Sequence, residues 1–173
     1  MHQIRYRIWQ TFQAMTARWR PVEDELAASV LPTPLFALFL SMSRNDRQHH
    51  LRVYKSLIGQ GHNHPALLQA ALLHDVGKTR YRFNVLDRIW IVIIKTLFPQ
   101  QFERWGSGEA KGWQRAIVIS AQHPHWGAEM VASAGGDPLA VELIKHHQDS
   151  VTTDMTTELR ELLPILKAAD DAN

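Results

Sequence analysis

The residues best suited to chemistry lie in the segment ALLHDVGKTRY, residues 71–81, where His74 and Asp75 follow an apolar run and Gly77 and Lys78 come next. A buried histidine–aspartate pair loses several kcal/mol of hydration free energy unless another group pairs with it. Two adjacent polar residues at the end of an apolar helix therefore indicate either a satisfied structural pair or a pair of ligands.

Most of the other histidines also come in close pairs. A single buried histidine is most simply a hydrogen-bonded core residue, but several unpaired imidazoles that converge in one core are costly. Helical bundles build metal sites from inward-pointing histidine and carboxylate side chains on different helices. The sequence therefore predicts a metal site in the core, and its candidate residues, besides His74 and Asp75, are the pairs His49–His50, His123–His125 and His146–His147, with Asp170. The remaining pair, His62 and His64, is expected to lie in a loop.

Composition limits the metals and the partners. The chain contains no cysteine, which excludes disulfides, thiolate zinc sites and cysteine nucleophiles. A metal must then be held by nitrogen and oxygen, which favours Mn or Fe, with Mg, Ni or Co as alternatives. A net charge of +2 gives weak support to a phosphate-bearing partner and none to nucleic acid. The first residues, MHQIRYRIWQ, lack the apolar core of a signal peptide, so a cytoplasmic location is expected.

The elements that must position these residues are helices. A length of 173 residues suits one domain, apolar residues recur at helical spacing, and strand alternation is missing. We expect an all-α fold in which residues 1–44 pack on a unit formed by residues 45–173. Proline starts and serine or asparagine caps predict the helices, with Pro65 opening the helix before His74 and Gly77 near its end. Later helices are expected at residues 112–121, 125–134, 138–147 and 156–172.

Five segments, spread over residues 45–170, resemble the motifs of the HD-domain superfamily of metal-dependent phosphohydrolases. HHLRV is similar to the first-ligand motif and assigns the ligand role to His49 and not to His50. ALLHDVGK is similar to the defining His-Asp-Ile-Gly-Lys segment, HPHWGAEM to the third motif, and IKHHQD to a paired-histidine motif of members that bind two metals. LKAADDAN is similar to the closing motif. The resemblance implies a single HD-domain helical bundle whose two divalent metal ions are held by His49, His74, Asp75, His123, His146, His147 and Asp170.

The resemblance also implies a reaction. The expected enzyme is a phosphodiesterase or phosphomonoesterase that attacks a nucleotide or related phosphate ester with a hydroxide activated by two metals. Asp75 is expected to bridge the metals. Lys78, four residues after His74, is a candidate catalytic residue that neutralises phosphate charge, or else a partner for the helix dipole. Arg80 and His125 are the candidates for binding substrate phosphate.

Departures from the family pattern narrow this expectation. Members that cleave cyclic di-GMP carry a Gly-Tyr-Pro signature after the paired histidines, and HHQDSVTTDM has none. Members with a third metal carry a glutamate four residues before the first histidine, where this chain has Asn45, so two metals are expected. The neighbouring Asp46 is expected to serve the surface only. His50 and His125 are expected to lie behind the ligands or to be exposed.

The most individual segment is an apolar insertion at residues 79–112. It contains the unbroken run Ile89–Ile94 between basic residues, and it is too short to span a bilayer. The simplest interpretation is a buried helix that packs over the core. A homodimer contact or a membrane-surface contact through residues 86–98 is the alternative, because Trp90 and basic flanks suit an interface.

Two other classes of function compete with the phosphohydrolase. Some relatives of this fold use the same ligands with two iron ions to oxidise organic substrates, which makes a di-iron oxygenase the first alternative. The second is a regulatory module that binds a nucleotide without cleaving it. Bound metal identity and turnover of phosphate esters separate the three.

Overall fold

The computed structural model describes residues 22–81 and 85–173, and this part of the chain is helical, without strands, as expected. The N-terminal part of the segment 1–44, up to residue 21, lies outside the described residues. The helices are α2 (Asp24–Val30), α3 (Thr33–Ser41), α4 (Arg44–Gly59), α5 (Pro65–Leu73), α6 (Val85–Leu97), α7 (Pro99–Gly106), α8 (Arg115–Ser133), α9 (Pro138–His146) and α10 (Thr157–Asp171), with short 3₁₀ turns η2 (Val76–Arg80) and η3 (Gly112–Gln114).

Local sequence signals set most of the helix starts. Pro65 and Pro138 are the first residues of their helices, where the missing N–H costs nothing. Ser43 caps α4, because its hydroxyl accepts a bond from the Asp46 N–H and donates to the Asp46 carboxylate at 2.6 Å. This reciprocal bonding is a capping arrangement, and it gives Asp46 a structural role at the start of the helix that carries two of the candidate histidines.

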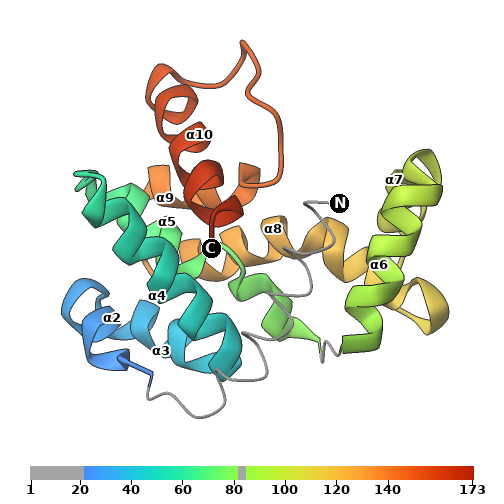
Figure 1. The fold of residues 1–173 in the computed structure, drawn as a ribbon, viewed down its shortest axis with the longest axis horizontal. Coiled ribbons are helices and arrows are strands. Elements are labelled where there is room, and N and C mark those ends of the chain that lie inside the picture. The colour runs from blue at the N-terminus through green and yellow to red at the C-terminus, as the bar shows by residue number, and fades with distance from the viewer. Residues whose placement is uncertain (1–21, 82–84) are drawn as a thin grey trace.

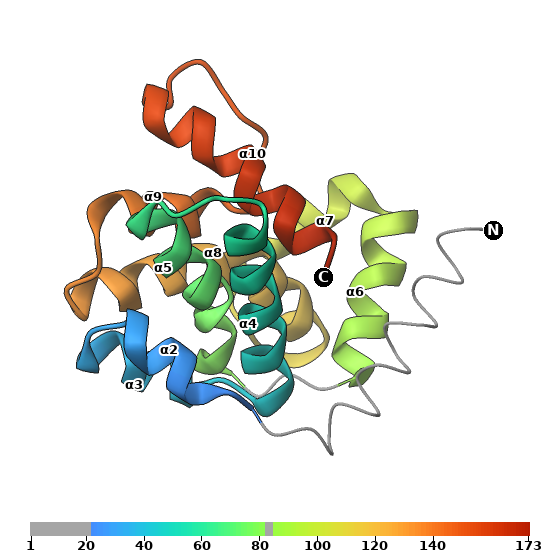
Figure 2. The same ribbon diagram turned by 60° about the vertical axis from the view of Figure 1, so that its left-hand side comes forward.

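Helix α5 lies in the middle of the bundle (Figures 1 and 2). Seven of its nine residues are buried, and it contacts α3, α4, α9 and α10. A helix that is apolar all round must be covered on every side. The buried residues of α2 and α3 belong to the same hydrophobic core as those of α4 and α5. The last turn of α5 therefore delivers its terminal residues into the centre of the molecule.

The insertion forms α6 and α7, which stand at one end of α8 (Figure 1). The expectation that Ile89–Ile94 is buried within the chain is wrong for most of the run. Ile91 and Ile94 are buried, whereas Ile89, Trp90, Val92 and Ile93 are 39–53% exposed. Six successive helical residues point in all directions, and α6 packs against α7 and α8 on one side. Among the described helices, none is both long enough and apolar enough to cross a bilayer.

Candidate metal centre

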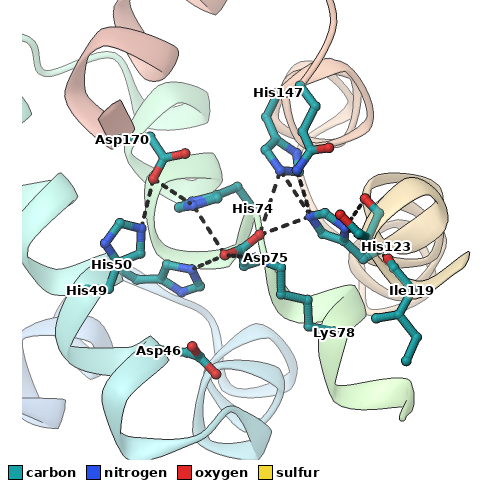
Figure 3. Close-up of polar contacts among 12 residues, drawn as sticks. Asp46, His49, His50, His74, Asp75, Lys78, Ile119, His123, His147 and Asp170 are labelled. Carbon is teal, nitrogen blue, oxygen red and sulfur yellow. Dashed lines mark hydrogen bonds and ion pairs between the residues drawn. The ribbon is translucent and has the colours of Figure 1, made fainter. Parts of the chain in front are cut away.

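Five elements bring their polar side chains to one place in the core (Figure 3). Asp75 lies at the middle of this centre, directly after the end of α5, and its two carboxylate oxygens face opposite sides. The other members come from helices far apart in the sequence. They are His49 and His50 on α4, His74 at the end of α5, His123 in α8, His147 at the end of α9 and Asp170 on α10.

Gly77 explains how η2 and α8 come close enough to form the centre. A Cβ atom built on Gly77 would lie 2.0 Å from the His123 carbonyl oxygen and 2.6 Å from the Gly127 nitrogen. Only a residue without a side chain permits this approach. Helix α5 accordingly ends at Leu73, earlier than expected, and residues 76–80 form a 3₁₀ turn against α8. Asp75 and His123 therefore become neighbours.

Helix α8 runs unbroken through Pro124, where the sequence predicted a break between two helices. Proline has no N–H, so the Ser120 carbonyl loses its usual helical partner. The ring of His123 replaces it, because its Nδ1 lies 3.1 Å from the Ser120 oxygen. The same contact fixes the orientation of the His123 ring, so the proline and the histidine before it form one structural unit.

Three buried histidines are held in the same way. His74 Nδ1 lies 3.2 Å from the Ala71 carbonyl oxygen, and His147 Nδ1 lies 2.6 Å from the Ile144 carbonyl oxygen. Both contacts are of the kind that His123 Nδ1 makes. A carbonyl oxygen only accepts hydrogen bonds, so each Nδ1 carries a proton and donates. In the neutral ring Nε2 is then left with a free lone pair, the form in which imidazole binds a metal.

On one side of the centre, acceptor atoms converge without enough donors. Asp75, His123 and His147 form the α8–α9 group, in which one ligand atom from each lies within 4.8 Å of the others. His123 Nε2 is 3.1 Å from Asp75 Oδ1 and 3.3 Å from His147 Nε2. The Gln148 amide nitrogen, 3.4 Å from His123 Nε2, is at the edge of hydrogen-bonding distance. Converging lone pairs and a carboxylate favour a cation among them.

The other side of the centre is the α4–α5 group, formed by His49, His50, His74 and Asp75. His50 is fully buried, and neither of its ring nitrogens has a hydrogen-bond partner. Its Nε2 lies 3.9 Å from Asp75 Oδ2. His74 Nε2 is also buried without a hydrogen bond. Unsatisfied buried groups of this kind are uncommon in folded proteins, and a metal ion would satisfy both.

Asp170 adjoins the α4–α5 group from α10. Its Oδ1 lies 2.8 Å from His49 Nε2 and 3.4 Å from His74 Nε2. His49 is therefore tied to α10 through a carboxylate, while His50 points to Asp75. The two neighbouring histidines of α4 serve different partners in the same group.

The electrostatics of the centre keep several members in the forms that bind metal. Burial and the nearby His74 lower the pKa of His50 to about 3, and burial and the Lys78 ammonium lower the pKa of His123 to about 4. Burial opposes ionisation of Asp75, but the Lys78 ammonium and the surrounding imidazoles hold its pKa well below the usual value. Near neutral pH the centre thus contains a carboxylate and at least two neutral imidazoles.

The pKa of His74 is shifted in the opposite direction. Burial alone would lower its pKa, but the Asp75 and Asp170 carboxylates raise it above the ordinary value. The Asp170 carboxyl is in turn held below its usual pKa, since contacts with His49 and His74 outweigh its burial. In the absence of a metal, His74 therefore holds a proton more readily than His50 or His123 does.

Lys78 lies beside the centre rather than one helical turn after His74. Its Nζ is 2.6 Å from Asp75 Oδ2, because the 3₁₀ turn folds the lysine back toward the carboxylate. This position keeps the Lys78 ammonium beside the candidate metal centre. It also makes Lys78 a direct partner of the shared carboxylate.

Other predicted site residues lie elsewhere. His146 is turned away from its neighbour His147, with Nδ1 2.7 Å from Asp149 and Nε2 3.4 Å from Glu142, and it belongs to neither group. Successive residues at the end of a helix diverge by about 100°, so one of them faces the core. His125 and Arg80 are exposed, and the Arg80 guanidinium lies 5.1 Å from the Trp126 ring centroid. His50 is the site residue that sequence reasoning placed outside the ligand set, although the doublet HHLRV was its signal.

No protein-family model matches the chain, and no curated protein or solved structure is similar to it at a significant level. The fit to a metal therefore rests on the centre itself. Its donors are imidazole nitrogens and carboxylate oxygens, two of its histidines have unsatisfied buried nitrogens, and each group has at least three ligand atoms close together. These residues are suited to hold a metal ion.

Proposed function

We propose that the chain is an HD-domain phosphohydrolase that uses two divalent metal ions to hydrolyse a nucleotide or a related phosphate ester. The observation that carries the proposal is the placement of Asp75 between two groups. Oδ1 faces His123 and His147, and Oδ2 faces His50 and Lys78. A carboxylate with one oxygen toward each of two histidine clusters is the arrangement that a shared ligand requires. The order of the five motifs in the sequence supports the same assignment.

The residues divide into two sets of metal ligands with Asp75 in common. His123 and His147 complete one set, and His49, His74 and Asp170 complete the other, with His50 as a further donor. Two divalent metal ions bound there would lower the pKa of water toward neutrality and neutralise the charge of a phosphoryl group. Three of the histidines that would hold them, His74, His123 and His147, have rings already oriented by backbone carbonyls.

Lys78 has a separate role in the proposal. Its ammonium holds Asp75 as a carboxylate and adds a fixed positive charge at the edge of the centre. A phosphoryl oxygen that approaches Asp75 Oδ2 would meet this charge, which favours the more negative transition state. Arg80 and His125 are exposed on the same segments as Lys78 and His123, and we keep them as candidates for contacts with the rest of the substrate.

Metal analysis and a substrate screen test the proposal. The purified protein is expected to contain about two equivalents of metal and to hydrolyse at least one phosphate ester, nucleotide or cyclic dinucleotide with Mn²⁺, Fe²⁺, Ni²⁺ or Mg²⁺. Asp75→Asn should lose both metals and all activity, whereas Asp149→Asn, an exposed aspartate bonded to His146, should lose neither. Absence of turnover with every metal would remove the phosphohydrolase assignment.

A di-iron oxygenase is the second candidate. The centre contains five imidazoles, His49, His50, His74, His123 and His147, against the two carboxylates Asp75 and Asp170, and nitrogen-rich coordination suits iron. Protein purified without oxygen would then contain iron, give an electron paramagnetic resonance signal when partly oxidised, and consume oxygen with an organic substrate. Tight nucleotide binding without either activity would instead indicate a regulatory module.

A further inference from the structure

Helix α6 exposes a row of large apolar side chains outside the side that packs on α8. Leu86, Ile89, Trp90, Ile93 and Leu97 are between 39% and 75% exposed, and their spacing places them along one side of the helix. We call these five residues the α6 face. Val92 and the following Phe98 are exposed as well. A monomer rarely presents so many neighbouring apolar side chains to water unless they bind something.

The described polar residues around the α6 face carry charges of both signs, with one lysine in excess. Asp87 is the acidic residue of α6, and it is turned to α8, where its carboxylate pairs with Arg115 at 2.8 Å. Lys95 is exposed at the other end of α6 and places its ammonium 4.8 Å from the Phe102 ring centroid. On α7, Arg104 and Glu103 are both exposed and balance each other. Among these residues the Lys95 ammonium is the charge that no acidic neighbour balances, so the face is apolar with a positive charge at its border.

Tryptophan side chains add to this pattern. Trp90 belongs to the face, and Trp113, which is 56% exposed, stacks edge-on against Trp105 of α7 with ring centroids 4.9 Å apart. The indole ring is apolar with one N–H donor, and it is enriched where hydrocarbon meets water. An exposed tryptophan within an apolar helical face, as Trp90 is, is typical of surfaces that enter the headgroup region of a membrane.

We propose that the α6 face binds the surface of an anionic lipid bilayer, with α6 lying in the plane of the headgroups. The helix has 13 residues, about 20 Å in length, so it lies on a bilayer and does not cross it. Its apolar side chains would enter the boundary between headgroups and acyl chains, while Lys95 remains among the phosphates. This proposal is independent of the reaction that the metal centre catalyses.

The charges favour a lipid surface over two protein occupants. A second copy of the chain would bring its own Lys95 to the same contact, and the α6 face offers no acidic side chain to neutralise it. Residues 1–21 of this chain have an apolar spacing that could cover the face, but they contain four arginines and no acid. Like charges oppose such a contact, whereas an anionic bilayer attracts both the segment and the border of the face.

Flotation with lipid vesicles tests the proposal on the full chain. The probes are vesicles of neutral phosphatidylcholine and vesicles in which part of this lipid is replaced by anionic phosphatidylglycerol. The variant is Ile93→Glu, on the α6 face at 41% exposure, and its matched control is Ile58→Glu, on α4 at 45% exposure. We expect the wild type and the control to float with the anionic vesicles, and Ile93→Glu to bind them roughly tenfold less tightly. Leu97→Glu, at 64% exposure, serves as a second variant if Ile93→Glu folds poorly.

Several results would overturn the proposal. Equal binding of Ile93→Glu and the wild type, equal binding to neutral and anionic vesicles, or no binding would each exclude an anionic surface for this face. A concentration-dependent dimer in light scattering that Ile93→Glu dissolves would identify a second copy as the occupant. A lower Tm of Ile93→Glu alone, without vesicle binding by any variant, would identify residues 1–21 as an internal cover.

Discussion

Lys78 donates to Asp75, with Nζ 2.6 Å from Oδ2, while Oδ1 of the same carboxylate lies 3.1 Å from His123 Nε2. The ammonium and the imidazole thus contact opposite oxygens of one side chain. Lys78 stabilises the charge of Asp75 and at the same time occupies one of its two ligand atoms.

Substitution of Lys78 by Met should separate its charge from its packing. We expect kcat for the best phosphate ester to fall by about 10²–10³-fold, the usual cost of one preorganised charge. Because the ammonium lowers the pKa of Asp75, the variant should also need a higher pH to bind its metals fully. Metal content near pH 8 should stay close to that of the wild type. Lys111→Met, at an exposed lysine paired with Glu109, is the control and should change neither quantity. A wild-type rate in Lys78→Met would limit the residue to a structural role.

His50 should destabilise the metal-free protein and stabilise the protein with bound metal. His50→Leu removes a fully buried imidazole with no hydrogen-bond partner. The free energy of unfolding of the metal-free variant should therefore be higher than that of the metal-free wild type by about 1–3 kcal/mol. The same variant should gain less stability from added Mn²⁺ than the wild type does, because a donor is lost. Equilibrium unfolding with and without Mn²⁺ measures both effects. His125→Leu, at an exposed histidine, should show neither, and a metal response of His50→Leu equal to that of the wild type would exclude His50 as a ligand.

Metal binding should lose one site before the other as the pH falls. The carboxylates raise the pKa of His74 above its ordinary value, so as the pH falls a proton competes with metal first in the α4–α5 group. The pKa of His123 is lowered to about 4, so its proton does not compete in the α8–α9 group until the solution is much more acidic. Equilibrium dialysis with Mn²⁺ should therefore show about two metals per chain near pH 8 and about one near pH 6. Parallel loss of both metals would contradict this assignment of the two groups.

The lowered pKa values also predict how the metal-free protein responds to acid. The histidines of the unfolded chain have pKa values near 6.5, whereas His50 and His123 bind protons in the folded state only at about pH 3 and 4. Between these limits the unfolded state binds more protons, so the free energy of unfolding must fall as the pH is lowered from about 6.5 to 4. His74, with its raised pKa, opposes this trend above 6.5 and partly offsets it. Urea unfolding between pH 8 and 4 measures the sum, and constant stability over this range would contradict the burial of the two neutral imidazoles.

Gly77→Ala should disrupt the centre through the backbone. The added methyl group would lie 2.0 Å from the His123 carbonyl oxygen, so η2 and α8 must separate. The free energy of unfolding should fall by about 1–3 kcal/mol, as at other overpacked sites. Separation moves Asp75 away from His123, and metal affinity should fall together with stability. Gly59→Ala is the matched control, because a methyl group there meets nothing within 4 Å and alanine favours the helix. Equal stability of the two variants would contradict the close approach of η2 to α8.

Local signals in the sequence determined the helices and most of the centre. Pro65, Pro138 and Ser43 mark helix starts, because a proline ring or a capping hydroxyl acts within a few residues of the chain. The apolar character of α5 required a central position, and this position brings the His-Asp pair into the core. The histidine and aspartate types, together with the absence of cysteine, restricted the chemistry to nitrogen and oxygen ligands.

Contacts between distant segments decided the rest. Which histidine of a doublet faces the core depends on how its helix is rotated against its neighbours, so His50 is buried on α4 and His146 is turned away at the end of α9. Pro124 is accommodated in α8 because the His123 ring satisfies the carbonyl that the proline leaves free. The apolar run of α6 is exposed because packing on α7 and α8 covers one side of a helix, whereas the sequence places apolar residues all around it. Hydrophobicity along the chain measures how much apolar surface an element has, and only the packing of other elements determines how much of it is covered.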